Sequence, residues 1–191
     1  NNAGKLKEFQ ELFSVTSVTL QPQAELGVAD VEETGLSFIE NALLKARNAA
    51  KCTGLPAIAD DSGLCVDYLK GEPGIYSARY AGTHGDRDAN VAKLHEKMLS
   101  VDKDDRKARF VCVLAFIRFE LDPVPTVVQA TWEGEIAQEL QGGGGFGYDP
   151  LFLIPSLGCT AAELDDNTKN KLSHRAQAME QLMTQLRGEL C

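Results

Sequence analysis

The sequence predicts an α/β protein: a mixed, twisted sheet flanked by helices, folded as one compact domain or as two closely packed lobes. Two observations predict this class. Strand-like stretches alternate along the chain with stretches whose apolar side chains recur at helical spacing. The 191 residues are also 43% hydrophobic, which is enough for a sizeable core. Because no repeat or linker interrupts the chain, we predict a single domain over residues 1–191.

Four stretches have the apolar spacing of helices. They cover residues 2–13, residues 37–51, residues 88–99 and a last segment with Ser173 as its N-cap. Ser37 and Glu40 match a capping box, in which both side chains bond backbone N–H groups at the start of a helix. In the last helix, Met179, Leu182 and Leu186 are expected to point inward.

Five stretches have the composition of strands. They cover residues 57–59, 64–69, 108–120, 126–137 and 151–154. The first is expected to stop at Asp60 and Asp61. The charged stretch 165–171 is predicted to be a loop.

The composition limits the partners and the compartment. A formal net charge of −9 argues against a broad contact with nucleic acid or an anionic membrane, because those partners need a positive face. No apolar run is long enough to span a bilayer. The five cysteines are odd in number and include no C-x-x-C pair, so we expect small core residues in a reducing compartment and a cytoplasmic protein.

The most informative stretch is Asp60, Asp61, Ser62 and Gly63. An apolar strand delivers two carboxylates and a hydroxyl to its carboxyl end, where open α/β sheets hold ligands. Adjacent strand residues point to opposite faces, so both carboxylates converge only if the backbone turns, which Gly63 permits. A site for a hard cation such as Mg²⁺ and an ordinary turn are equally good interpretations of this spacing.

Other acidic residues lie earlier in the chain. Glu40 is the natural third carboxylate, but the capping box already accounts for it and is the better interpretation from the residues alone. Glu32 and Glu33 are predicted to form a solvated acidic turn.

Asn2 to Lys5 open the first predicted helix. Backbone N–H groups and an ammonium at that point suit a phosphate, but the spacing is not that of a P-loop. An ordinary exposed helix terminus is the favoured interpretation.

Gly142, Gly144 and Gly147 satisfy G-x-G-x-x-G, yet Pro150 follows too soon for the helix that a dinucleotide site needs. Glycines let the backbone approach a flat ligand, with Phe146 or Tyr148 stacking on a base and Asp149 accepting a hydrogen bond from its edge. The alternative, slightly favoured by composition, is a hairpin loop whose aromatic residues fill the core.

Ser173, His174 and Arg175 begin the last helix, and Lys169 lies just upstream. This group suits an anion or the carbonyl edge of a base. The alternative is a serine cap with exposed basic side chains. The histidines form no zinc pattern, and no Ser, His and Asp grouping has the logic of a triad.

Together these segments resemble the inosine triphosphate pyrophosphatase family, the house-cleaning purine nucleotide pyrophosphatases, in its bacterial branch. The resemblance covers nearly the whole chain. It rests on residues 2–5 (NAGK), 33–42 (ETGLSFIENA), 59–64 (ADDSGL), 71–82 (GEPGIYSARYAG), 145–150 (GFGYDP) and 173–175 (SHR). The family normally has a strand and a T-G-N triplet before the lysine loop, whereas here only Asn1 and Asn2 remain. We therefore expect the natural chain to begin earlier, with its first strand missing from this sequence.

The resemblance implies roles for individual residues. It implies that Asp61 is the general base and a Mg²⁺ ligand, with Glu40 and Asp60 as companion carboxylates. The residues that would hold the triphosphate are Ser62, Asn2 and Lys5. The residues of the base pocket would be Phe146, Gly147, Tyr148 and Asp149, and the purine edge would contact Lys169, His174 and Arg175.

The implied reaction is hydrolysis of ITP, dITP or XTP to the monophosphate and pyrophosphate, in an active cleft between the lobes of a homodimeric enzyme. Hydrogen bonds to a 6-keto purine would discriminate against adenine. The same carboxylates and metal could instead remove only the terminal phosphate. A nucleotide-binding sensor without turnover is a second alternative, and a structural domain is a third.

Overall fold

The computed structural model describes Phe9, Phe13 and residues 18–186, and both phenylalanines are helical. The rest of the predicted first helix lies outside the described residues. From Phe38 on, the elements, with η for a 3-10 helix, are α2 (Phe38–Thr53), β1 (Ala57–Val66), η1 (Gly74–Arg79), α3 (Arg87–Met98), η2 (Lys103–Asp105), β2 (Lys107–Ile117), β3 (Thr126–Ile136), η3 (Asp149–Leu151), β4 (Phe152–Ile154), β5 (Cys159–Thr160), α4 (Asp166–Leu172) and α5 (His174–Leu186). The predicted α/β class is confirmed.

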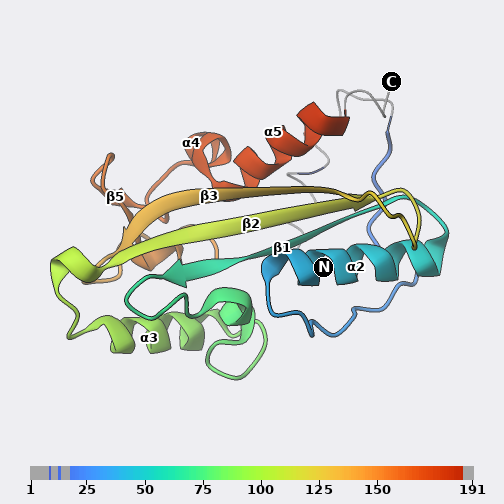
Figure 1. The fold of residues 1–191 in the computed structure, drawn as a ribbon. Helices are drawn as coiled ribbons and strands as arrows, with labels where there is room; N and C mark the ends of the chain where they lie inside the picture. Colours follow the sequence, from blue (N-terminus) through green and yellow to red (C-terminus); the bar gives the residue numbers. More distant parts are fainter. Residues whose placement is uncertain (1–8, 10–12, 14–17, 187–191) are drawn as a thin grey trace. The chain divides into compact units, whose positions relative to one another are not determined.

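The strands form one five-stranded sheet in the order β1-β2-β3-β4-β5 (Figure 1). β3 and β4 are antiparallel, with Glu135 opposite Leu153, and β4 and β5 are antiparallel, with Leu153 opposite Thr160. Helices accompany the sheet, as the alternation of patterns along the sequence predicted.

The chain divides into two compact units. Unit 1 comprises Asn1–Asp61, Val113–Gln129 and Ala178–Cys191, and unit 2 comprises Ser62–Cys112 and Ala130–Gln177. Each of β1, β2 and β3 therefore contributes to both units. Two units agree with the predicted two lobes, while the cleft stays a prediction.

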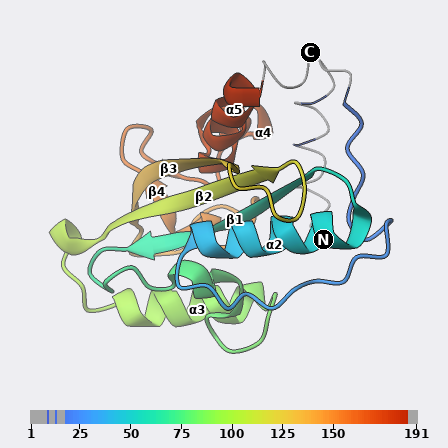
Figure 2. The same cartoon turned by 45° about the vertical axis from the view of Figure 1, so that its right-hand side comes forward.

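In unit 1, helix α2 begins as the capping box predicted. The Ser37 hydroxyl accepts a hydrogen bond from the Glu40 N–H (3.2 Å), and Gly54 ends the helix in the left-handed conformation. The buried face of the helix carries Ala42, Ala46 and Ala50, and small side chains allow a close approach to the sheet. Figures 1 and 2 show α2 running beside β1.

Also in unit 1, the turn between β2 and β3 is tied to α2. Arg47 donates to the carbonyl oxygen of Asp122 (3.1 Å) and to that of Glu120. The buried Asp122 side chain accepts hydrogen bonds from the Arg118 guanidinium and from the N–H groups of Arg118 and Val124. This carboxylate therefore organises the turn.

Unit 2 contains a core of large apolar side chains. Its buried members include Leu64, Val66, Leu94, Met98, Phe110, Trp132, Ile136, Tyr148, Leu151 and Phe152. Arg106 is also buried, and its guanidinium donates to the carbonyl oxygens of Met98, Val101, Ile136 and Ala137 at 2.6 to 3.0 Å. These bonds connect the end of α3 to the end of β3.

Two local predictions were wrong. β1 does not stop at Asp60 but continues through Asp61, Ser62 and Gly63 to Val66, so the backbone turn expected there is absent. Residues 166–172 form helix α4 rather than a loop, with Asp165 as N-cap accepting from the Thr168 N–H (3.0 Å). In both places, sheet pairing or capping overrides a polar sequence.

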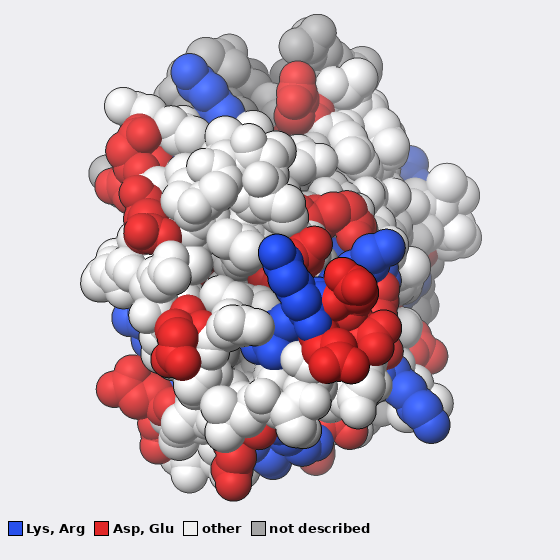
Figure 3. Space-filling view, turned by 90° about the vertical axis from the view of Figure 1, so that its left-hand side faces the viewer, with Lys and Arg blue, Asp and Glu red and all other residues white. Residues whose placement is uncertain are grey.

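The charged surface, the helices and the exposure of the cysteines can be compared with what the composition predicted. On the face drawn in Figure 3, acidic side chains are scattered and interspersed with Lys and Arg. None of the helices in the described part of the chain is both long enough and apolar enough to span a bilayer. Cys112 is buried, Cys65 and Cys159 have restricted exposure, and Cys52 is exposed, contrary to the expectation of a core residue.

Candidate active site

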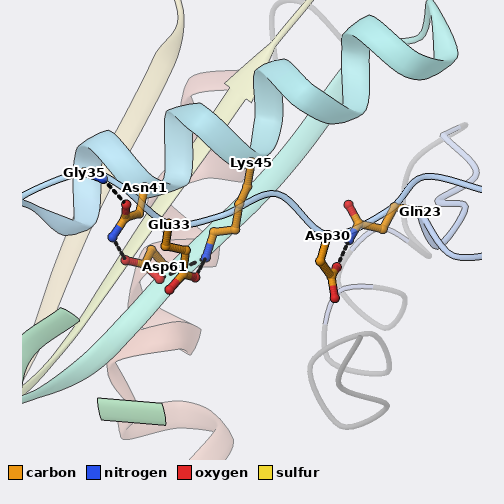
Figure 4. Close-up of polar contacts among 7 residues, drawn as sticks. All are labelled: Gln23, Asp30, Glu33, Gly35, Asn41, Lys45 and Asp61. Carbon is orange, nitrogen blue, oxygen red and sulfur yellow. Dashed lines mark hydrogen bonds and ion pairs between the residues drawn. The ribbon is translucent and has the colours of Figure 1, made fainter. Parts of the chain in front are cut away.

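Strand β1 places Asp61 against helix α2. Asp61 is 7% exposed, and its Oδ1 accepts a hydrogen bond from Lys45 Nζ (2.9 Å) while its Oδ2 accepts one from Asn41 Nδ2 (3.3 Å) (Figure 4). Asn41 and Lys45 are four residues apart, so they lie on one face of the helix. A buried carboxylate held by an amide and an ammonium has a fixed orientation, as a reacting group needs.

The same ammonium contacts a second carboxylate. Lys45 Nζ donates to Glu33 Oε1 (3.0 Å) (Figure 4). Lys45 therefore bridges Glu33, in the segment before α2, and Asp61, in the strand after it. The Glu33 side chain is 24% exposed. The predicted solvated acidic turn is therefore wrong for Glu33, which belongs to the Asp61 group.

The environment shifts two pKa values in this group. Burial raises the pKa of Asp61, and the charge and hydrogen bond of Lys45 only partly offset that effect. Burial by itself would lower the pKa of Lys45, but the negative charges of Asp61 and Asp60 outweigh it and raise that pKa. Lys45 therefore stays protonated, while Asp61 is more basic than an ordinary aspartate.

Asp60 and Ser62 flank Asp61 within the continuous strand. Adjacent side chains of a strand start on opposite faces, so the two aspartates do not converge through a turn as expected. Asp60 nevertheless lies close enough to Lys45 for its charge to raise the pKa of the ammonium. Ser62 is the first residue of unit 2.

Glu40 serves the start of α2. Its Oε2 accepts hydrogen bonds from the Leu36 N–H (2.8 Å) and the Ser37 hydroxyl (2.8 Å), and these bonds lower the pKa of the carboxyl group. The capping interpretation from the residues alone is confirmed. A role of Glu40 as a metal ligand stays a prediction.

The residues around Lys45 fit a hard cation. The described residues include no group of three His, Cys, Asp or Glu side chains that by itself could hold a metal ion. Mg²⁺, however, needs only one or two carboxylates, with waters and substrate phosphates as its other ligands. The Lys45 ammonium lies between two carboxylate oxygens, so Glu33 and Asp61 already accommodate a positive charge.

In unit 2, residues 142–148 form a segment that we call the glycine loop. Gly142, Gly145 and Gly147 all have positive φ angles, which other residues rarely adopt. Phe146 is 64% exposed, whereas Tyr148 is buried and donates its hydroxyl to the Ser77 carbonyl oxygen (2.8 Å). Each earlier interpretation therefore fits one aromatic residue: Tyr148 fills the core, and Phe146 is free to stack.

Asp149 connects the glycine loop to helix α4. The buried carboxylate accepts a hydrogen bond from the Phe146 N–H and forms an ion pair with Lys169. The resemblance assigned both Asp149 and Lys169 to recognition of the purine, and the structure brings the two side chains together. Because Lys169 belongs to α4, the unpredicted helix positions a candidate residue.

His174 and Arg175 begin α5, directly after Ser173. The Ser173 hydroxyl accepts from the Ala176 N–H (3.2 Å), as the predicted cap requires. The His174 ring stacks on Phe110, with centroids 4.9 Å apart and 12° between planes. Phe110 in turn contacts Trp132 (6.4 Å) and Phe152 (4.5 Å), so an aromatic cluster of the core supports the imidazole.

Asn2 and Lys5 lie outside the described residues.

The sequence analysis did not identify Lys45 and Asn41 as residues of the site. The sequence does contain a signal for both residues. They lie beside the alanines that form the buried face of α2, and a polar side chain at such a position needs a hydrogen-bond partner.

Known proteins resemble this chain over nearly its whole length. Residues 1–185 match the Ham1 family. A dITP/XTP pyrophosphatase of Thioalkalivibrio sulfidiphilus is 54% identical, and one of Escherichia coli O157:H7 is 55% identical, each over 98% of this chain and 95% of the relative. Among solved structures, a HAM1 protein from Coxiella burnetii has a TM-score of 0.94 and 50% identity over 98% of this chain and 95% of its own. The Staphylococcus aureus Ham1 protein has a TM-score of 0.89 and 44% identity, covering 99% and 96%.

Proposed function

Since this chain belongs to the Ham1 family, we propose that it hydrolyses dITP, ITP and XTP to the nucleoside monophosphate and pyrophosphate. Such an activity removes non-standard purines from the nucleotide pool before they enter DNA or RNA. The structural observation that supports it best is the buried Asp61 carboxylate, oriented by Lys45 and Asn41.

Asp61 is the proposed general base. The oxygen of a water molecule forms a bond to the α phosphorus. The bond between that phosphorus and the oxygen bridging to the β phosphate breaks, and pyrophosphate leaves. The proton of the water passes to Asp61. The hydrogen bonds from Lys45 and Asn41 support this role, because they hold the carboxylate in one orientation.

We propose Mg²⁺ as the cofactor, with Asp61 as its principal ligand and Asp60, Glu40 and Glu33 as candidate companions. The ion would neutralise negative charge that develops on phosphate oxygens. The bridge that Lys45 makes between Asp61 and Glu33 favours Glu33 over Glu40 as the nearest companion. Ser62, Asn2 and Lys5 are the proposed contacts of the triphosphate.

The purine base of the nucleotide would be recognised by residues of unit 2. Phe146 would stack on the purine, with Gly147 and Tyr148 shaping the loop beside it. We assign the edge of a 6-keto purine to Asp149, Lys169, His174 and Arg175, since an amino group at that position would leave buried partners unpaired. The proposed enzyme is a cytoplasmic homodimer that binds neither nucleic acid nor membranes.

A substrate panel tests the proposal. We expect ITP, dITP and XTP to be hydrolysed in the presence of Mg²⁺, with ATP and GTP much slower, and chromatography to identify pyrophosphate. Orthophosphate as the sole phosphate product would instead support removal of the terminal phosphate. Binding of these nucleotides without any turnover would support a sensor.

The Asp61→Asn variant tests the base. We expect kcat to fall by at least about 100-fold while nucleotide binding persists, because the amide keeps the shape but accepts no proton. Asp30→Asn is the matched control: Asp30 is an exposed carboxylate of unit 1 that accepts from Gln23 (2.7 Å), and an amide oxygen can replace that bond (Figure 4). Normal turnover by Asp61→Asn would show that another group is the base.

A further inference from the structure

Arg87 lies at the start of α3, on a backbone that is firmly held. The Asp86 carboxylate caps the helix by accepting from the Ala89 N–H (3.1 Å). One turn later the buried Asn90 accepts from the Ala81 N–H (2.6 Å) and donates to the Ala78 carbonyl oxygen (3.2 Å). The first turn of α3 is therefore fixed to η1, through Ala78, and to Ala81 just after it.

The position is electrostatically unfavourable for an arginine. The N-terminus of a helix has a partial positive charge, which repels a guanidinium in the first turn. The side chain instead interacts elsewhere: Arg87 Nε donates to the Gly147 carbonyl oxygen (3.2 Å) and Nη2 to that of Gly144 (3.4 Å). Both acceptors belong to the glycine loop.

These two carbonyl groups flank Phe146. Between them lie only Gly145 and Phe146, and Gly145 has a positive φ angle that permits large backbone excursions. Other hydrogen bonds act at Phe146 itself or after it. The Phe146 N–H donates to the Asp149 carboxylate, the Phe146 carbonyl oxygen accepts from the Asp149 N–H (3.2 Å), and the Tyr148 hydroxyl donates to Ser77. Arg87 therefore contacts both ends of the segment that presents the exposed ring.

We propose that Arg87 is a positioning residue that clamps the glycine loop through the Gly144 and Gly147 carbonyl groups, so that Phe146 is held ready to stack on a flat purine. The inference rests on the proposed function for the identity of the ligand. Arg87 itself need not touch the nucleotide. A loop that is ordered before binding loses less conformational entropy when the base arrives, so the clamp acts on affinity.

The first test uses the protein without substrate. In Arg87→Met, which keeps an apolar stem but removes both donors, we expect amide hydrogen exchange over residues 143–147 to rise by about tenfold, consistent with the loss of two modest hydrogen bonds. Lys103→Met is the matched control, because it removes an exposed cation from η2 in the same unit. Unchanged exchange in the loop of Arg87→Met would overturn the clamp.

The second test separates positioning from simple charge. We expect Arg87→Met to raise KM for dITP by about tenfold while kcat changes by less than about twofold, because proton transfer at Asp61 is unaffected. Arg87→Lys keeps the charge but lacks the planar fork that spans two carbonyl groups, so its KM should stay near that of Arg87→Met. Full recovery by lysine would show that charge, rather than the clamp, sets the affinity.

The exchange test can fail or succeed independently of the proposed function, whereas the kinetic test requires the proposed activity. A wild-type protein that hydrolyses no purine nucleotide would refute the assigned activity, and the exchange measurement, which uses no nucleotide, would still decide on the clamp. Equal melting temperatures of the variants and the wild type show that the comparison is made on folded protein.

Discussion

The ammonium of Lys45 lies 2.9 Å from the Asp61 carboxylate and joins helix α2 to strand β1 at the candidate base. Asp61 is nearly buried, so the contact supplies a positive charge where water cannot. The same ammonium contacts Glu33, and the three side chains thus form one charged unit.

Replacing Lys45 by methionine is expected to lower activity and to increase the stabilisation that Mg²⁺ provides. Without the ammonium, Glu33 and Asp61 repel each other, and a divalent cation relieves that repulsion. The measurement is the melting temperature of each protein with and without Mg²⁺. Lys51→Met is the control, since Lys51 is an exposed residue of the same helix, 3.6 Å from Glu120. An equal Mg²⁺ effect on Lys45→Met and wild type would mean that the metal does not bind beside Lys45.

Glu33→Gln and Glu40→Gln are expected to differ. The Glu33 change removes a carboxylate from the Lys45 bridge, so the Mg²⁺ concentration needed for half-maximal activity should rise by about tenfold or more. Glutamine still completes a capping box, so Glu40→Gln should leave both stability and the metal requirement close to those of the wild type. The reverse ranking in a Mg²⁺ titration would assign the ligand to Glu40.

Gly145→Ala is expected to impair base binding. A Cβ at this position would lie 2.9 Å from Cβ and Cγ of Asp149, and the φ of +77° is unfavourable for alanine. The Asp149 carboxylate would have to move, so KM for dITP should rise by about tenfold or more. Gly143→Ala is the matched control, because its Cβ would meet no atom within 4 Å. Comparable steady-state kinetics for the two variants would show that Asp149 does not contribute to purine binding.

Asp122 is expected to make the fold sensitive to acid. Hydrogen bonds from the Arg118 side chain, followed by backbone N–H groups, hold the pKa of Asp122 well below its usual value. The unfolded chain therefore takes up the proton first, and the stabilisation present above about pH 4 is lost as the pH falls further. Denaturant unfolding of Asp122→Asn should show lower stability at neutral pH and a weaker decline below about pH 4. Parallel pH curves for variant and wild type would contradict this role.

Several elements could be predicted because local signals agreed with the fold. The Ser37 and Glu40 capping box marks the start of α2, and Ser173 marks that of α5. In α5, Met179, Leu182 and Leu186 are buried as their spacing predicted. Caps and apolar periodicity are contained in a few consecutive residues, so one sequence suffices to detect them.

The predictions were wrong where contacts between residues far apart in the sequence determine the local structure. Asp60 and Asp61 have low strand propensity, yet pairing within the sheet continues β1 through both. Glu33 looks like a solvated residue until the fold brings it to Lys45, twelve positions away. The clamp between Arg87 and Gly147 joins residues sixty positions apart, and no local pattern announces it.

The protein has a single tryptophan, and its location gives the molecule a built-in optical reporter. Trp132 contacts Phe110, and Phe110 stacks on His174 at the start of α5. A ligand that displaces the imidazole therefore alters the packing around the only indole. We therefore expect intrinsic fluorescence to change when a ligand occupies that end of the helix, without any attached dye.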